Sequence, residues 1–326
     1  MKILITGANG FIGSSLVKEL IDDYELNLLI RKTSNIQRIS SVIHKTKVFY
    51  GDIREKNSLI EPIKNCDIII HTAAVLRCVD NKTYFQVNYQ GTKNLVEVIF
   101  EHGKNLKGII YFSSLAAAGP SLNGLPKQVG FETPVSYYGK SKFLAEKEIL
   151  KCKDVIKTVV LRPSAVYGPY DKDMFLYFKM ASMGFFPYFA KNFSIQFTYI
   201  KDIIRIVKEI LKNFEKINSD VFFIAEEKCY NVFEIRDILS KINNKKILLI
   251  KLPYSIAYLY AFLNEKITYL LSKKPAVFNR DKLKELSYSY WGCCSDKILK
   301  YINFKYTPLI EGLFETYMWY KENKWL

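Results

Sequence analysis

The residues best suited to chemistry in this chain are Tyr138 and Lys142, four positions apart. On a helix, side chains with this spacing lie one above the other. A free phenol has a pKa of about 10, so a tyrosine alone is a poor acid–base catalyst at neutral pH. A nearby ammonium favours the phenolate, which suits proton transfer at a hydroxyl while a hydride moves on the adjacent carbon. In a chain with 23 tyrosines the spacing alone is not specific, so its meaning depends on the elements around it.

Those elements alternate between short apolar runs and amphipathic stretches. The runs are rich in Ile and Val without apolar–polar alternation, and they predict strands covered on both faces at 2–6, 25–30, 47–50, 67–71, 108–113 and 158–161. The stretches between them predict helices at 11–21, 57–64, 84–101 and 141–152. This rhythm is typical of an α/β protein with a doubly wound parallel sheet of the Rossmann type.

The pattern loosens after Pro169, where aromatic residues crowd the sequence. It returns with a predicted strand at 197–200, a helix at 203–214 and a strand at 221–225, and the rest is mostly helical. We therefore expect a nucleotide-binding domain over residues 1–168, with 197–226 returning to it, and a smaller, mostly helical substrate lobe from 169–196 and 227–326.

A glycine turn between the first strand and the first helix predicts a dinucleotide site. It reads Thr6-Gly7-Ala8-Asn9-Gly10-Phe11-Ile12-Gly13, with Gly7, Asn9, Gly10, Phe11, Ile12 and Gly13 as expected cofactor contacts. Glycines there permit a tight turn and let backbone N–H groups approach a pyrophosphate at the helix N-terminus.

The Gly-x-x-Gly-x-x-Gly spacing resembles that of the extended short-chain dehydrogenase/reductase family. Further segments resemble the family in the expected order: Gly51-Asp52-Ile53, His71-Thr72-Ala73-Ala74, 87–95 around Asn88, Ser113-Ser114 and 161–169. The resemblance implies an adenine contact at Asp52 and Ile53, an apolar wall at Thr72, Ala73 and Ala74, and a nicotinamide contact at Pro163, Ser164 and Val166.

The resemblance also implies a catalytic set of Ser114, Tyr138 and Lys142. Tyr137 is excluded, because four residues after it lies Ser141. Ser114 would hydrogen-bond the substrate oxygen, Tyr138 would exchange the proton, and Lys142 would lower the pKa of Tyr138 and bind the nicotinamide ribose. Ser113 is expected to be structural or to face the cofactor, and Asn88 either to brace its helix or to join a proton relay.

The end of the second strand favours NADP(H) over NAD(H). Members that prefer NAD place an acid there to hold the ribose 2′-hydroxyl. Here Arg31 and Lys32 stand in that place, and five Lys or Arg but no acid lie between Leu26 and Gly51. A guanidinium can hold a 2′-phosphate in a fork, although both cations could also be ordinary solvated residues.

The substrate lobe leaves two chemistries open. A nucleotide-sugar epimerase or dehydratase needs cations for a diphosphate, and Lys179, Lys191, Lys201 and Arg205 are available in no diagnostic spacing. The lobe offers instead many aromatic residues. Its tail resembles that of the dihydroflavonol-reductase-like and 3β-hydroxysteroid-dehydrogenase-like members at Trp291, 297–304 and 308–313. We therefore favour an NADP-dependent oxidoreductase acting on a fairly apolar carbonyl or alcohol, with the epimerase or dehydratase, and a non-catalytic cofactor sensor, as alternatives.

Charge and cysteine usage bear on partners and location. The net charge is +16, but no basic block or nucleic-acid-reading motif is present, so a small-molecule substrate and no nucleic acid are expected. The six cysteines form no Cys-x-x-Cys pair, which argues against a metal site and for reduced thiols in a cytoplasmic protein without a signal peptide.

Two surfaces have more than one interpretation. The apolar segment 252–271 carries Glu265 and Lys266 within it, so we expect a buried or lobe-packing helix and no transmembrane span, with peripheral membrane contact as the alternative. The helices at 84–101 and 141–152 match those through which family members pair. Val87, Leu95, Val98, Ile99, Phe143 and Leu144 allow a homodimer there, although sheet packing explains the same residues.

Overall fold

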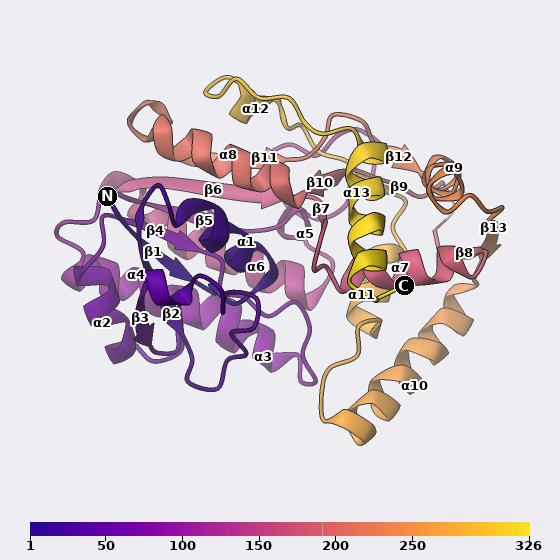
Figure 1. The fold of residues 1–326 in the computed structure, drawn as a ribbon, viewed down its shortest axis with the longest axis horizontal. Helices are drawn as coiled ribbons and strands as arrows, with labels where there is room; N and C mark the ends of the chain where they lie inside the picture. Colours follow the sequence, from indigo (N-terminus) through magenta and orange to yellow (C-terminus); the bar gives the residue numbers. More distant parts are fainter. Residues whose placement is uncertain (191) are drawn as a thin grey trace.

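A seven-stranded parallel sheet forms the centre of the protein (Figure 1). The computed structural model describes residues 1–190 and 192–326. The strands are β1 (Lys2–Thr6), β2 (Glu25–Ile30), β3 (Lys47–Tyr50), β4 (Ile68–His71), β5 (Gly108–Phe112), β6 (Lys157–Pro163) and β11 (Asp220–Ile224). Their order is β11-β6-β5-β4-β1-β2-β3, which confirms the predicted doubly wound sheet. The order reverses between β1 and β4, and in such sheets ligands bind outside the carboxyl ends of the strands at that point.

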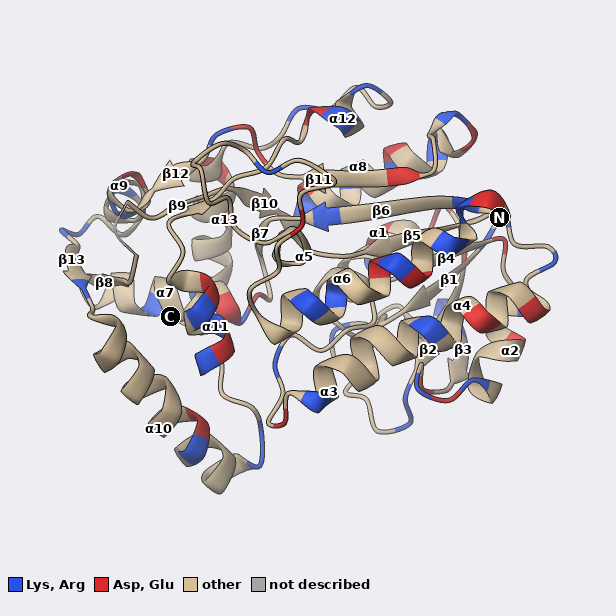
Figure 2. Cartoon of the chain, turned by 180° about the vertical axis from the view of Figure 1, so that it is seen from behind, with Lys and Arg blue, Asp and Glu red and all other residues tan. Residues whose placement is uncertain are grey.

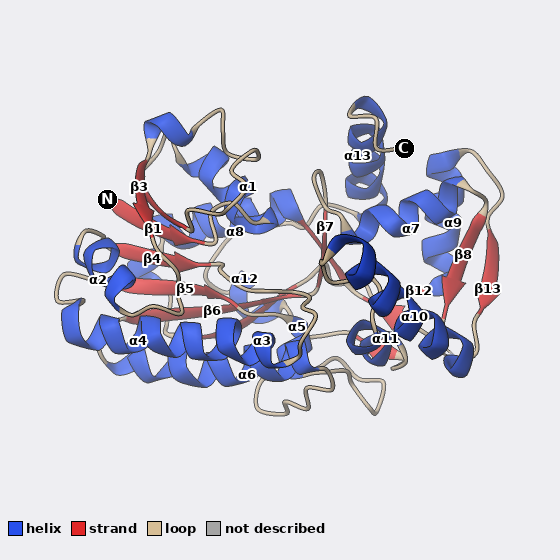
Figure 3. Cartoon of the chain, turned by 90° about the horizontal axis from the view of Figure 1, so that it is seen from below, coloured by secondary structure: helices blue, strands red, loops and turns tan. Residues whose placement is uncertain are grey.

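Helices cover both faces of the sheet (Figure 3). They are α1 (Phe11–Leu20) and α8 (Ile200–Lys212) on one face, and α2 (Asn57–Lys64), α4 (Gly91–His102) and α6 (Tyr137–Ile149) on the other. Neighbouring residues of one strand serve the two faces in turn, as a period of two requires. Ile3 and Ile5 of β1 join the core under α1 and α8, whereas Leu4 joins the core under α2, α4 and α6.

The remaining elements gather beyond the carboxyl ends of the strands (Figures 1 and 3). β7 (Ala165–Tyr167) pairs with β10 (Phe197–Tyr199), β8 (Phe185–Tyr188) with β13 (Leu248–Lys251), and β9 (Ser194–Ile195) with both β12 (Tyr230–Asn231) and β14 (Tyr290–Trp291). The helices of this region are α7 (Asp173–Ser182), α9 (Val232–Asn243), α10 (Tyr254–Ser272), α11 (Arg280–Leu286) and α13 (Leu309–Glu322). The short helix α12 (Asp296–Leu299) lies instead beside the edge strand β11 (Figure 1), where Lys297 pairs with Asp220 at 2.5 Å. Short α-helices, α3 (Lys82–Tyr84) and α5 (Leu115–Ala118), flank β4 and β5 in the chain.

Several predicted boundaries were wrong. The helix expected from 141 begins at Tyr137, because Ser136 accepts a hydrogen bond from Gly139 N and so caps it. The helix expected over 84–101 contains a π-helical turn, Phe85–Gln90, between α3 and α4. The strand expected at 197–200 pairs with β7 and lies outside the main sheet, while the strand that follows, β11, pairs with β6.

Of the two expectations for 252–271, a buried helix was wrong, whereas a lobe-packing helix fits, because α10 packs on α11 along a narrow seam. Helix α10 begins after Pro253, a residue well suited to a helix start. Of its side chains only Ala257 and Ala261 are buried, against Leu283 of α11. Among residues 1–190 and 192–326, no helix has the length and apolar character needed to cross a bilayer.

Candidate active site

The glycine turn forms a cradle at the N-terminus of α1. Gly7 has φ = +70°, and a side-chain Cβ at this position would lie 2.6 Å from the backbone N of Ala73. A Cβ on Gly13 would collide with the carbonyl oxygen of Gly7. The Gly10 N–H closes the turn on Gly7 O at 2.9 Å, and Phe11 and Ile12 begin α1. Gly7 and Gly13 place no side chain where these backbone segments come close to one another. The cradle therefore fits a pyrophosphate bound at a helix N-terminus.

The segment after β4 lies against this cradle. Thr72 Oγ1 donates to Thr6 O at 2.7 Å, and Ala73 and Ala74 follow it beside the turn. Behind them His71 is buried, with Nδ1 2.6 Å from Thr6 Oγ1 and Nε2 3.0 Å from Thr92 Oγ1. Burial, and secondarily the charge of Lys142, lower the pKa of His71 to about 3. His71 is therefore a neutral link between β1, β4 and α4, a role that the sequence analysis missed.

The predicted adenosine contacts lie at the ends of β2 and β3. Arg31 and Lys32 follow β2 directly, and both are exposed. The Asp52 carboxylate accepts from Arg54 Nε at 3.0 Å and from its terminal NH2 group at 2.7 Å, which lowers the pKa of Asp52. Ile53 is buried, and its side chain fills the space that a Cβ on Gly91 would need. Asn9 Nδ2 donates to Asn35 O at 3.3 Å, which joins the glycine turn to the loop after β2.

The structure brings Ser114 and Tyr138 together. Ser114 caps α5 and accepts from Ala116 N at 3.1 Å. Burial and then the charge of Glu285 raise the pKa of Tyr138 to about 12, while a hydrogen bond with Ser114 lowers it. The ring of Tyr138 lies edge-on to that of Tyr84, with centroids 6.2 Å apart. Ser113, buried next to Ser114, has a hydroxyl without a hydrogen-bond partner among the described residues.

Lys142 lies one turn further along α6, and its ammonium is turned toward the sheet. Nζ donates to Phe112 O at 2.6 Å and lies 4.2 Å from the centre of the Tyr111 ring. Burial lowers the pKa of Lys142 to about 7, although Glu146 opposes this shift. The phenol of Tyr138 therefore has a raised pKa here, not the depressed one expected from Lys142.

Asn88 sits in the π-helical turn, and its contacts are those of a brace. Its Nδ2 donates to Val75 O at 3.1 Å and to Ser141 Oγ at 2.9 Å, and its Oδ1 accepts from Val75 N at 2.8 Å. Ser141 Oγ donates in turn to Tyr138 O at 2.7 Å. The extra residue of a π-turn thus directs a fully buried amide at the loop after β4 and at α6.

Helix α11 holds the start of α6, a contact that the sequence analysis missed. The two oxygens of Asp281 accept from Tyr137 N at 2.8 Å and Tyr138 N at 3.1 Å. Ser136 Oγ donates to Glu285 Oε1 at 2.6 Å, and Glu285 also accepts from Lys282 Nζ at 2.9 Å. Carboxylates near a helix N-terminus are favourable, so α11 fixes the turn that carries Tyr138.

A second missed contact ties α6 to β6. Arg162 is buried and donates to Glu146 through Nε at 2.9 Å and NH2 at 2.5 Å, and to Glu132 through NH1 at 2.8 Å. Pro163 ends β6 beside it, and the Ser164 hydroxyl lies 3.0 Å from Thr198 Oγ1.

Val166 lies in the middle of β7 and is partly buried. It packs against the larger of the two apolar cores, and its backbone partner across the sheet is Thr198 of β10. Pro163 is thus the last residue of β6, Ser164 follows it, and Val166 lies in β7 beyond the carboxyl end of β6.

An aromatic cavity of about 100 Å³ lies outside the main sheet, among α7, α9, α11, α13 and the short strands β7 to β10. Its walls are almost entirely apolar and include Tyr177, Phe178, Phe186, Phe189, Phe193 and Phe197. Among the described residues that line it, the one cation is Lys282, whose charge lowers the pKa of Tyr138 while those of Glu285 and Asp173 raise it. Helix α11 links the aromatic cavity to Tyr138, because Lys282 lines the cavity and the preceding residue, Asp281, accepts a hydrogen bond from Tyr138 N at 3.1 Å.

Three of the four cations that the sequence offered for a diphosphate are described, and none of the three lines the aromatic cavity. Lys201 pairs with Glu315, and Arg205 pairs with Asp202. Lys179 is exposed on α7, and Lys191 lies outside the described residues.

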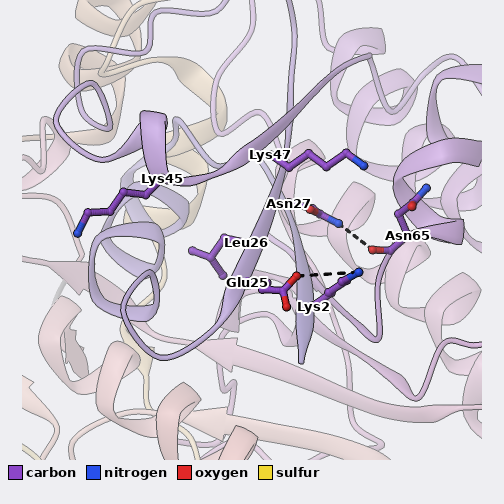
Figure 4. A pocket seen from close by; sticks show the side chains of 7 residues that line it. All are labelled: Lys2, Glu25, Leu26, Asn27, Lys45, Lys47 and Asn65. Carbon is purple, nitrogen blue, oxygen red and sulfur yellow. Dashed lines mark hydrogen bonds and ion pairs between the residues drawn. The ribbon is translucent and has the colours of Figure 1, made fainter.

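A second hollow, of about 250 Å³, lies at the opposite edge of the sheet (Figure 4). Lys2, Glu25 and Lys47, the first residues of β1, β2 and β3, line it. Figure 4 shows the Lys2–Glu25 ion pair, at 3.9 Å, and the 2.8 Å bond from Asn27 Nδ2 to Asn65 O across it. Because it lies at the amino ends of the strands, it is separate from the site around Tyr138.

Comparison with known proteins gives full-length relatives of two kinds. The chain is 25% identical over 283 residues to the N-acetyl-alpha-D-glucosaminyl-diphospho-ditrans,octacis-undecaprenol 4-epimerase of Escherichia coli O157:H7, covering 84% of this chain and 82% of that protein. It is 24% identical over 352 residues to the decarboxylating sterol-4-alpha-carboxylate 3-dehydrogenase of Schizosaccharomyces pombe, covering 99% and 98%. Both kinds of enzyme therefore remain open for this chain.

Solved structures share the fold. The UDP-glucuronic acid 4-epimerase of Bacillus cereus, in complex with UDP-glucuronic acid and NAD, superposes with a TM-score of 0.77 at 23% identity, over 99% of this chain and 100% of that one. Residues 4–248 match the model of the 3-beta hydroxysteroid dehydrogenase/isomerase family. The chain belongs to the 3-beta hydroxysteroid dehydrogenase/isomerase family, a group of extended short-chain dehydrogenases/reductases.

Proposed function

We propose that this protein is an NADP(H)-dependent oxidoreductase that reduces a carbonyl, or oxidises the corresponding alcohol, of a fairly apolar small molecule. The observation that carries the proposal is the aromatic cavity joined to Tyr138 through α11, which has one cation, Lys282, among the described residues that line it. An apolar pocket with few polar groups suits a ligand held mainly by burial of its surface.

In this proposal the chain's own residues move one proton and hold one developing charge. Tyr138 gives its phenolic proton to the carbonyl oxygen during reduction, and Ser114 donates a hydrogen bond to the same oxygen. With a pKa of about 12 the phenol is protonated at neutral pH, but it is a weak acid until that pKa is lowered. In the complex with cofactor, we expect Lys142 to leave Phe112 O, bind the nicotinamide ribose and lower the pKa of Tyr138.

The cofactor supplies or accepts the hydride. The glycine cradle and the N-terminus of α1 would hold its pyrophosphate, and Thr72, Ala73, Ala74, Pro163, Ser164 and Val166 would line its path. Arg31 and Lys32, exposed at the end of β2 with no acid between Leu26 and Gly51, support a preference for a 2′-phosphate. Asp52 would contact the adenine only if it shared its carboxylate with Arg54.

The alternative is an epimerase or dehydratase that keeps its cofactor bound. The E. coli relative is named for a substrate that joins a sugar diphosphate to a polyprenol. Lys282 at the wall of the aromatic cavity could serve one phosphate of such an amphiphilic molecule. The ion pairs of Lys201 and Arg205 speak against a soluble nucleotide sugar.

One experiment separates these functions. The purified protein is mixed with NADPH and a panel of apolar ketones, and the nicotinamide absorbance is followed. We expect stoichiometric loss of NADPH with at least one ketone. Tightly bound cofactor that stays spectrally unchanged while a nucleotide sugar or polyprenyl-diphosphate sugar is interconverted would replace the proposal with the alternative.

We further propose a division of labour within the chain. Residues 1–168 with 197–226 would bind the cofactor, and 169–196 with 227–326 would bind the substrate. We place the protein in the cytoplasm, where its six free cysteines stay reduced.

A homodimer through α4 and α6 remains a proposal. Leu95, Val98 and Ile99 are buried in the protein's own core, which leaves Val87, Phe143 and Leu144 partly exposed for a partner. Sedimentation that reports a monomer would remove the dimer.

A further inference from the structure

The most exposed apolar element of the described residues is α10, which projects from the body of the protein (Figure 1). Ile256, Leu259, Leu263, Ile267, Leu270 and Leu271 are all exposed, and Leu270 and Leu271 retain 72% and 79% of their accessible surface. Their spacing of three, four and seven residues places them on one face of the helix. The helix is seated on the protein along a different and narrow seam, formed by Ala257 and Ala261.

The surroundings of this apolar face are basic and aromatic. Between Lys251 and Arg280 the chain carries five cations (Lys251, Lys266, Lys273, Lys274 and Arg280) and one acid, Glu265. Glu265 is paired with Arg280 at 2.8 Å, so the lysines dominate the local field. In Figure 2 nearly the whole of α10 is uncharged, with its charged residues confined to one turn. The exposed tyrosines Tyr254, Tyr258, Tyr260 and Tyr269 add rings that are amphipathic, as is common at membrane–water interfaces.

We propose that α10 docks on the surface of an anionic lipid bilayer, lying in the plane of the membrane with its Ile and Leu face among the acyl chains. Lysines flanking such a helix attract anionic headgroups, and buried apolar area then holds the helix there. The +16 net charge of the whole chain favours the same partner.

Helix α11, on which α10 packs, connects the exposed apolar face of α10 to the candidate active site. Leu283 of α11 is fully buried against Ala257 and Ala261, and Phe189 belongs both to that contact and to the wall of the aromatic cavity. Lys282 and Leu286 of α11 line the same cavity. Asp281 and Glu285, on the same helix, bind the start of α6.

A bilayer under α10 would therefore lie next to the aromatic cavity. We infer that the substrate is a lipid-soluble molecule that reaches Tyr138 from the membrane. This second step rests on the proposed function, whereas the docking of α10 does not.

Vesicle sedimentation tests the docking. The full chain is mixed with unilamellar vesicles of phosphatidylcholine alone, or of phosphatidylcholine with phosphatidylglycerol, and the pelleted fraction is measured. We expect binding to the anionic vesicles that weakens as salt screens the lysines. Leu270→Glu with Leu271→Glu should reduce the partition coefficient by at least about tenfold, because each change removes a large apolar side chain from the interface.

Two further variants make the test specific. Val155→Glu is the matched control, because Val155 is 67% exposed on a segment far from α10 in the chain, and it should bind like the wild type. Lys273→Glu with Lys274→Glu should remove the preference for anionic vesicles. Unchanged NADPH binding by all variants would show that they are folded.

Other outcomes would overturn the docking proposal. One is a wild-type protein that stays in the supernatant with both vesicle types. Another is a wild-type dimer in sedimentation that the Leu270 and Leu271 changes convert to a monomer, because α10 would then be an interface between two copies.

The second step is tested separately, with a long-chain ketone dissolved in the vesicles and a short water-soluble ketone. The Leu270 and Leu271 double variant should slow reduction of the first by about tenfold and leave the second unchanged. If the double variant reduced both ketones at the wild-type rates, delivery of the substrate from the membrane would be overturned. If the wild type reduces neither ketone, the proposed function fails, while the sedimentation result on α10 stands.

Discussion

The backbone N–H of Tyr138 donates a 3.1 Å hydrogen bond to Oδ2 of Asp281, a residue 143 positions later in the chain. The neighbouring N–H of Tyr137 donates to the other oxygen at 2.8 Å. The turn that carries the proposed proton donor is therefore held by the region that lines the aromatic cavity. The proposed substrate pocket and the proposed proton donor are joined through α11 at this point.

Loss of this contact should affect stability and rate together. We expect Asp281→Ala to lower the free energy of unfolding by about 1 kcal/mol, as for loss of a helix cap, and to lower kcat. Asp281→Asn keeps one acceptor oxygen. Its free energy of unfolding and its kcat should therefore lie between those of Asp281→Ala and the wild type. Urea unfolding and steady-state kinetics measure both effects, with the exposed Asp154→Ala as control. Equal stability of Asp281→Ala and wild type would contradict the role.

Removal of the phenolic oxygen should abolish turnover selectively. We expect Tyr138→Phe to lose at least about 10²-fold in kcat, because no other group would supply the proton, while cofactor affinity stays nearly unchanged. The ring contact with Tyr84 is retained by Phe. Tyr137→Phe is the matched control, since Tyr137 is adjacent and 47% exposed, and it should keep its rate. A fully active Tyr138→Phe enzyme would refute the assignment.

Lys142 should make stability depend on pH above neutrality. Burial lowers its pKa from 10.5 to about 7, so between these values the unfolded chain binds more protons than the folded chain. Stability therefore rises with pH across this window, with a contribution approaching about 1.4 kcal/mol per pH unit. Lys142→Met should flatten this rise, whereas Lys147→Met, an exposed lysine of the same helix, should not. Urea unfolding at several pH values measures the slopes, and identical slopes in all three proteins would contradict the prediction.

His71 should act on the acid side. Its pKa is lowered from 6.5 to about 3. Between these pH values the unfolded chain therefore binds a proton at His71 that the folded chain does not bind. Stability should thus fall as the pH drops below about 6.5. His71→Gln should be less stable than the wild type at neutral pH, because Thr6 and Thr92 lose their hydrogen bonds to the imidazole ring. On acidification, however, its free energy of unfolding should fall less than that of the wild type. The exposed His44→Gln is the control, and an unchanged acid slope in His71→Gln would count against the prediction.

Arg31 and Lys32 should discriminate between the two nicotinamide dinucleotides. We expect Arg31→Ala to weaken NADPH binding by about 10-fold or more, because a forked hydrogen bond to phosphate is lost, and to leave NADH binding nearly unchanged. Lys32→Ala should have a smaller effect of the same kind. Lys47→Ala, at the opposite end of the strands, is the control in fluorescence titrations. Tighter binding of NADH than of NADPH by the wild type would end the proposal.

The parts of the structure that sequence could predict are those determined locally. The glycine turn is one, because a positive φ at Gly7 and the close approach of Ala73 are met by glycine alone. The strands of the main sheet are another, because runs such as Lys2–Thr6 are apolar on both faces. The register of Tyr138 and Lys142 on one helix also follows from spacing, although the helix start at Tyr137 was missed.

What escaped prediction depends on partners far away in the chain. Asp281 and Glu285 read as ordinary helix carboxylates until α11 meets α6. Arg162 interrupts an apolar strand, and only the fold supplies Glu146 and Glu132 to pair it. The apolar composition of α10 was visible, but sequence cannot say whether such a helix faces a core or solvent. The direction of the Lys142 ammonium depends on Phe112 O, a backbone group without a sequence signal.

The pairing of β6 with β11 has a consequence for the birth of the protein on the ribosome. The residues of β6 lie about 60 positions before their partners in β11, so β6 is made with one edge open. The cradle of residues 7–13 follows β1 and lies against the end of β4, so it can form early, whereas Asp281 is made 143 residues after Tyr138. A nascent chain is thus expected to form the proposed dinucleotide cradle before the turn that carries Tyr138 is fixed. The proposed hydride chemistry would be withheld until α11 has joined α6.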